Sequence, residues 1–206
     1  MKRRSLLSVG GLGLASVSGF GLSVQSRTAV RTPEISVEAD SVADERDVSI
    51  AVSLEQGFSD DNPAQITIAL TNTAAVEQRF QFGLTPPFSA YSPTESSSIY
   101  LVPNDTSSWL PVIDDDDRVP AEETDRSGTE LIPDEPIHGC WRLPRSVGYH
   151  LSGVVLSMDP DETVQETYSI FGSSTSRQCL PSDDYRFIEE NYLGLDWEWG
   201  ITVSIA

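Results

Sequence analysis

The sequence VSIAVSL, residues 48–54, alternates apolar and small side chains, and ITIAL at residues 66–70 does the same. Successive side chains of a β-strand point to opposite faces of a sheet, so this alternation predicts two strands with one buried face each. The turn-forming segment Ser59-Asp60-Asp61-Asn62-Pro63 lies between them and predicts a change of chain direction. These two stretches point to antiparallel β-structure.

The same period-two pattern recurs along most of the chain. Further apolar or alternating runs lie at residues 35–37, 80–84, 99–102, 154–156, 164–171, 185–188 and 201–205. Turn residues separate them, at 72–73, 159–161 and 181–184. No segment of helical length keeps a period of 3.6 residues. About nine short strands separated by turns are typical of an antiparallel, immunoglobulin-like β-sandwich, and we therefore expect an all-β fold.

Residues 103–150 interrupt this pattern. They hold six of the 13 prolines and a run of four aspartates at 114–117, with little alternation. A long connection of this kind within a compact domain predicts an insertion with a role of its own. We expect one β-sandwich domain over residues 34–206, carrying this long irregular insertion and a short strand near residues 110–113. Residues 27–33 are predicted to form a flexible leader.

The first 26 residues have the pattern of an export signal. Lys2, Arg3 and Arg4 precede an uncharged segment, residues 6–24, that is rich in Gly and Ser as well as apolar residues. The pair Arg3-Arg4, with two leucines shortly after it, resembles the twin-arginine class of signals, whose substrates cross the membrane folded. Cleavage after Ser26 leads us to expect a secreted or cell-surface protein. A retained N-terminal membrane anchor is the alternative.

The charge of the remaining chain is strongly negative. Residues 1–26 hold three of the 13 basic residues and no acid, so the remainder carries 10 basic and 32 acidic side chains, a net charge of −22. Lys2 is the sole lysine. Acid excess without lysine resembles the proteins of extreme halophiles, because molar salt shortens the Debye length to about 3 Å and screens the repulsion. Nucleic acids and anionic membrane surfaces are poor partners for this charge, and we expect no nucleic-acid partner.

The two cysteines, Cys140 and Cys179, predict one disulfide, because an even pair in an exported protein is normally oxidised. The bridge encloses 39 residues and tethers the end of the insertion to the edge of the sandwich. Metal binding is the alternative, with His138 as the one histidine at close spacing.

Two features could support metal binding or catalysis. In the aspartate run, Asp114 and Asp116 point to the same side of an extended segment and could bind Ca²⁺, which prefers oxygen ligands; a solvated acidic loop is the alternative. His138 and His150 are the two histidines and both lie in the insertion. We found no Gly-x-Ser-x-Gly or His-Glu-x-x-His motif, so surface roles are favoured over a hydrolytic triad.

Aromatic residues in loops are the candidate binding residues. Phe88 and Tyr91 lie in a proline-rich segment, residues 86–93, and Trp109 lies in the insertion. Rigid loops that present aromatic side chains lose little entropy on binding, so we expect these three side chains to be exposed. Asn104 begins an Asn-Asp-Thr sequon and is a candidate glycosylation site. Trp197 and Trp199 are expected to pack in the core, with sugar stacking as the alternative.

Three segments occur in an order that resembles a known family. They are Leu70-Thr71-Asn72-Thr73, Asp159-Pro160-Asp161-Glu162-Thr163 and Leu180-Pro181-Ser182-Asp183-Asp184-Tyr185-Arg186-Phe187. This order is similar to that of immunoglobulin-like exported domains, including the intracellular proteinase inhibitor family. The resemblance covers roughly half of the chain after the signal and implies the fold more than it implies inhibition.

The function expected from these patterns is that of an exported, non-enzymatic binding or cell-surface accessory module adapted to high salt. Its partner would be a protein or a glycan at the cell surface, and a membrane only if the signal is retained as an anchor. One alternative is a proteinase inhibitor that presents residues 86–93. The other is a hydrolase that uses His138 or His150 with acids of the insertion.

Overall fold

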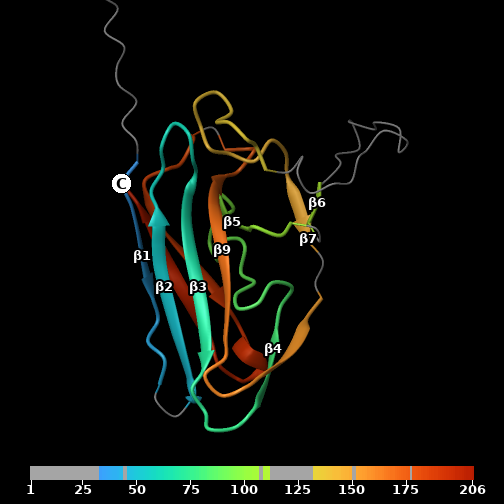
Figure 1. Cartoon of the computed structure of the whole chain (residues 1–206). Helices are drawn as coiled ribbons and strands as arrows, with labels where there is room; N and C mark the ends of the chain where they lie inside the picture. Colours follow the sequence, from blue (N-terminus) through green and yellow to red (C-terminus); the bar gives the residue numbers. More distant parts are fainter. Residues whose placement is uncertain (1–32, 44–45, 107–108, 112–131, 150–151, 177) are drawn as a thin grey trace, which may run out of the picture. The chain divides into compact units, whose positions relative to one another are not determined.

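The computed structural model of this chain describes residues 33–43, 46–106, 109–111, 132–149, 152–176 and 178–206. These residues form an all-β fold in which every strand pairing is antiparallel (Figure 1). The expected export signal at residues 1–26 and nearly all of the leader at 27–33 lie outside the described residues. No helix in the described part of the chain is long and apolar enough to cross a membrane.

The larger sheet has four strands in the order β2-β3-β9-β5. Their bounds are Val48–Gln56, Ala64–Asn72, Thr163–Gly172 and Ile99–Pro103. The predicted alternation is clearest in β3, where Ala64, Ile66, Ile68 and Leu70 are completely buried and the residues between them are half-buried. This strand is central in the sheet, between β2 and β9 (Figure 1). Its apolar residues belong to the buried core.

The second sheet has three strands in the order β1-β11-β10. Their bounds are Ile35–Ala39, Trp199–Ile205 and Asp183–Glu189. Its central strand, β11, buries Trp199, Ile201, Val203 and Ile205 on one face. The red C-terminal strands pass behind β2, β3 and β9 (Figure 1). Because apolar residues of both sheets belong to one buried cluster, the two sheets form the layers of a sandwich.

Two short strand pairs and one short helix complete the described structure. The pairs are β4 (Gln78–Phe82) with β8 (Val154–Met158), and β6 (Trp109–Pro111) with β7 (Val147–Tyr149); the 3₁₀ helix is η3 (Tyr192–Gly194). Every strand expected from the apolar runs overlaps an observed strand. The short strand expected near residues 110–113 corresponds to β6. Strand β7 was not expected, because the three residues Val-Gly-Tyr are too short to show a period.

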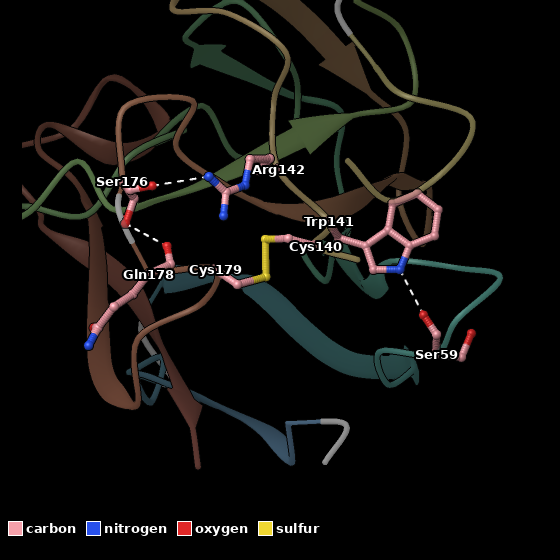
Figure 2. The surroundings of a disulfide bond; sticks show 7 residues. All are labelled: Ser59, Cys140, Trp141, Arg142, Ser176, Gln178 and Cys179. Atoms are coloured by element: carbon pink, nitrogen blue, oxygen red, sulfur yellow. Dashed lines mark hydrogen bonds between the residues drawn. A yellow bond between two sulfur atoms is a disulfide. The ribbon is translucent and has the colours of Figure 1, made fainter. Parts of the chain in front are cut away.

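The disulfide predicted from the cysteine pair is present. Cys140 and Cys179 are joined, with their Cα atoms 5.4 Å apart. Next to the disulfide, the amide of Leu143 donates to the carbonyl of Gly172, and the amide of Gly172 donates to the carbonyl of Trp141. These two bonds form a parallel bridge at the end of β9. Figure 2 shows the indole of Trp141 turned away from the sulfur atoms, and its ring nitrogen donates to the carbonyl of Ser59 at 2.7 Å. The insertion is thus tied to the larger sheet, as expected.

Candidate functional site

The outer face of the larger sheet carries small polar side chains where β2, β3 and β9 lie side by side. We call this surface the polar face. Its residues are those of the three strands that alternate with the buried ones: Ser49, Ala51, Ser53, Glu55, Gln65, Thr67, Ala69, Thr71, Thr163, Gln165, Thr167 and Ser169. Eleven of these twelve side chains are uncharged, Glu55 being the exception.

Hydrogen bonds between neighbouring strands hold the side chains of the polar face in position. The hydroxyl groups of Thr67 and Thr167 lie 2.9 Å apart, and those of Thr71 and Thr163 lie 2.7 Å apart. The register of the sheet places the members of each pair directly opposite each other. Cross-strand threonine pairs of this kind stabilise a sheet. A hydroxyl in such a pair keeps unused hydrogen-bonding capacity, because its oxygen has two lone pairs.

The polar face is hollowed into a shallow depression of about 620 Å³, lined by residues of β2, β3 and β9 and by Asn104. Hydroxyl and amide groups supply most of its hydrogen-bonding atoms, and no lysine or arginine lines it. Such a surface can exchange hydrogen bonds with a neutral, hydroxyl-rich ligand. It offers no paired charge for an ionic one.

The insertion covers the other end of the same outer face. The alternation of β9 and β5 places Phe171 and Val102 on that face, yet both are buried. Trp141 packs edge-on against Phe171, with the ring centroids 6.2 Å apart, and Leu143 is also buried. The disulfide holds this cover in place (Figure 2). The insertion therefore covers the apolar end of the face, and the described residues leave the polar end uncovered.

Asn104, the candidate glycosylation residue, lies at the margin of the depression. It follows directly after β5 and is exposed, and its backbone amide hydrogen-bonds the carbonyl of Thr167 at 3.2 Å. Thr106, the third residue of the sequon, is buried, with 6% of its surface exposed. In the folded protein the asparagine is accessible while the sequon threonine is not.

The expectation that Phe88 and Tyr91 are exposed is wrong. Phe88 is completely buried and Tyr91 is 2% exposed. Phe88 packs edge-on against Trp199 at 5.4 Å, and its carbonyl accepts a hydrogen bond from the hydroxyl of Tyr168. The proline-rich segment folds over the edge of the core, because aromatic partners from distant parts of the chain bury its side chains. Neither residue is available as a binding anchor.

A carboxylate anchors the same segment from the other sheet. Glu189, at the end of β10, accepts hydrogen bonds from the backbone amides of Ser89 at 2.7 Å and Gly83 at 3.4 Å. Burial raises the pKa of Glu189, and these two hydrogen bonds partly offset that rise. The hydroxyl of the buried Tyr192 donates to the carbonyl of Pro87, and burial raises the pKa of Tyr192 well above its usual value. Glu189 was not among the residues predicted from the sequence, because nothing in its local sequence distinguishes it from other surface acids.

Several other candidate residues lie outside the described part of the chain. Asp114 and Asp116, the possible calcium ligands, and His150 are among them, and of Trp109 only the backbone in β6 is described. His138 is exposed, in a turn with φ 54°. Within the described ranges no acid or nucleophile hydrogen-bonds to its ring, and no group of three or more His, Cys, Asp or Glu side chains could hold a metal ion.

The tryptophans near the C-terminus pack in the core, as predicted. Trp199 is completely buried, and the ring of Tyr192 stacks on it at 5.2 Å. Trp197 precedes β11 rather than lying on it, packs edge-on against Tyr192, and lies 5.0 Å beneath the guanidinium of Arg46. These contacts leave no pair of parallel indoles for a sugar ring.

Comparison with known proteins gives no relative: no protein family, no curated protein and no solved structure matches this chain.

Proposed function

We propose that this chain is an exported, non-enzymatic binding module whose recognition surface is the polar face. The observation that carries the proposal is a hollowed surface of aligned hydroxyl and amide groups, with Glu55 as its one charged side chain among the described residues, in a protein of net charge −19. Its ligand is a neutral, hydroxyl-rich molecule, and a glycan at the cell surface fits that description. Such a ligand can satisfy many hydrogen bonds at once without a charge partner.

Hydrogen bonds that remain effective in concentrated salt suit this setting. Ionic contacts at an exposed surface are screened when the Debye length falls to about 3 Å, whereas hydrogen bonds between neutral groups are not. Acid excess and the single lysine support adaptation to molar salt, and the paired arginines near the start support export in the folded state. A surface that recognises its ligand through neutral groups is consistent with both.

Two internal contacts support an immunoglobulin-like assignment of the sandwich. The hydroxyl of Tyr185, near the start of β10, donates to the carbonyl of Pro181, four residues earlier, at 2.8 Å. In immunoglobulin domains a tyrosine near the start of a strand makes the same kind of bond at the corner between the sheets. The second contact is the corner at Asn72, which links β3 to the turn before β9.

Neither alternative function has comparable support. The inhibitor hypothesis needs residues 86–93 to project a side chain into a protease, and Phe88 and Tyr91 are buried instead. The hydrolase hypothesis needs an acid and a nucleophile bonded to a histidine, and among the described residues neither hydrogen-bonds to the ring of His138; His150 lies outside the described residues. Binding by the scaffold itself requires no such group.

The experiment is an oligosaccharide array probed in molar salt with the wild-type protein and two variants. Thr167→Arg places a long charged side chain in the middle of the polar face and should abolish binding. Val155→Arg makes a comparable change on β8, where the valine is 53% exposed, and should leave binding intact. No binding by the wild-type protein to any oligosaccharide, or equal binding by Thr167→Arg, would overturn the proposal.

Export is tested separately by replacing Arg3 and Arg4 with lysine. The variant should remain in the cytoplasm, and undiminished secretion would remove the twin-arginine assignment.

A further inference from the structure

A second hollow lies away from the polar face, between the segment after β4, strand β7 and the end of β10. Its volume is about 260 Å³. Pockets that hold drug-sized ligands span about 300–1,000 Å³, so this one suits a small molecule or a single extended side chain. Among the described residues, Leu84 and Ile188 form apolar wall and Tyr91 and Tyr149 form aromatic wall. Glu189 places a carboxylate in the pocket, and Glu190 lies at its exposed rim.

Glu189 differs from the other described acids in its surroundings. Glu189 is half-buried, its carboxylate contacts the backbone of Gly83 and Ser89, and desolvation raises its pKa. Two backbone amides donate to it, one at 2.7 Å and one at a longer 3.4 Å. Throughout the described ranges no Arg or His side chain forms a salt bridge with it. A carboxylate has about four lone-pair positions, so this one keeps acceptor capacity after both amides are counted.

The aromatic wall beside this carboxylate is rigid. The rings of Tyr91 and Tyr149 meet edge to face with their centroids 4.7 Å apart. Tyr91 is buried and its hydroxyl donates to that of Thr85, so it supports the half-buried ring of Tyr149 from behind. A cation beside the face of an aromatic ring is attracted by the ring quadrupole, and more strongly where water is excluded.

We propose that this pocket binds the ammonium group of a small alkylamine or of a lysine side chain. The ammonium would hydrogen-bond the free lone pairs of Glu189, and the methylene stem would lie along Leu84, Ile188 and Tyr149. Charged groups withdrawn from water are normally paired, and a ligand cation provides the missing partner. Residues 27–206 contain no lysine, so a lysine side chain in this pocket would come from another polypeptide.

This site is independent of the function proposed above. Its residues come from β7, from β10 in the three-stranded sheet and from the segment after β4, and none of them belongs to the polar face. Loss of one activity should therefore leave the other unchanged.

The experiment is an NMR titration of the full chain with n-butylammonium in molar salt, with n-butanol as the neutral reference. Binding should be saturable for the ammonium and absent for the alcohol. Glu189→Gln keeps an oxygen that can accept from Ser89 but removes the charge, and should weaken binding about tenfold to hundredfold. Tyr149→Leu should weaken it about threefold to thirtyfold, through loss of the aromatic face.

Glu190→Gln is the matched control, since it removes the same charge from the exposed rim of the same pocket. It should change the affinity by less than about threefold. Equal weakening by Glu190→Gln and Glu189→Gln would overturn the proposal in favour of diffuse attraction to an acidic surface, and failure of the wild-type protein to bind n-butylammonium would overturn it outright. Nα-acetyl-lysine amide, which keeps its ε-ammonium, is titrated in parallel to distinguish a lysine side chain from a small alkylamine. Tighter binding than that of n-butylammonium indicates a polypeptide ligand.

Discussion

Asn72 shows how much of this fold depends on a single polar side chain. It is completely buried at the end of β3, and its amide nitrogen lies within 3.1 Å of the carbonyl oxygens of Val76, Met158 and Asp159. Its side-chain oxygen accepts from the backbone amide of Ala74 at 3.0 Å. A buried amide that is satisfied in this way fixes the position of both turns it touches.

Replacing Asn72 with alanine should lower the free energy of unfolding by about 2–4 kcal/mol, because it leaves buried carbonyl groups without a donor. Denaturant unfolding in molar salt measures this change. Thr73→Ala, at the exposed neighbouring position, is the control and should cost less than about 0.5 kcal/mol. Similar values for the two variants would show that the Asn72 corner contributes nothing special.

Glu189 gives a prediction about pH. Burial raises its pKa in the folded protein, so the folded state holds this proton more tightly than the unfolded state does. Its contribution to stability is then most favourable below the pKa of the unfolded chain and is lost as pH rises through the higher folded value. Among the described residues the neighbouring ionisable groups are Tyr91, Tyr149, Glu190 and Tyr192, and burial raises the pKa of Tyr91 and Tyr192 further from this range.

Glu189→Gln removes this titration. The free energy of unfolding of the variant minus that of the wild type should be larger at neutral pH than at mildly acidic pH. Denaturant unfolding in molar salt measures both values. The salt screens the overall repulsion, which would otherwise add its own dependence on pH. A stability difference that is independent of pH would contradict the raised pKa.

At the scale of elements, the insertion forms part of the sandwich. Gly172, at the end of β9, has no room for a side chain: a Cβ atom there would lie 2.4 Å from the carbonyl oxygen of Cys179. The same residue hydrogen-bonds Trp141 and Leu143 through its backbone. The close approach at Gly172 therefore lets three segments meet beside the disulfide.

Gly172→Ala should destabilise the protein by about 1–3 kcal/mol, because the backbone must shift to relieve the contact. Gly57→Ala is the control, since a Cβ atom there meets only a side-chain methyl of Ile35 at 3.7 Å, an ordinary contact. Thermal unfolding of both variants makes the comparison. Equal melting temperatures for the two variants would show that the backbone near Cys179 moves aside without loss of stability.

At the scale of the whole molecule, net charge decides the response to salt. Arg186 and Asp40 form the one salt bridge among the described residues, and screening such a partly exposed pair costs at most about 1 kcal/mol. Repulsion among the excess acids acts in the opposite direction and over the whole surface. The sign of the salt effect should therefore follow the net charge.

The melting temperature should rise steeply between dilute buffer and molar sodium chloride. Sucrose, which strengthens burial without screening charge, is the control and should give a smaller rise. A melting temperature that is flat in salt, or that rises equally in sucrose, would show that the acidic surface is not an adaptation to high salt.

The sequence alone determined every described strand except β7, the class of fold and the disulfide. The alternation at residues 48–54 and 66–70 predicts β2 and β3 because the pleat imposes a period of two on any strand with one buried face. Cys140 and Cys179 have only each other to pair with. These inferences succeed because each depends on local geometry or on simple counting.

Tertiary structure alone decided which residues are exposed in the loops. Phe88 is buried because Tyr168 and Trp199, about 80 and 110 residues away in the chain, pack around it. The polar face and the pocket beside Glu189 likewise depend on strands that meet only after folding. The exposure of a loop residue is set by long-range contacts, which leave no periodic trace in the local sequence.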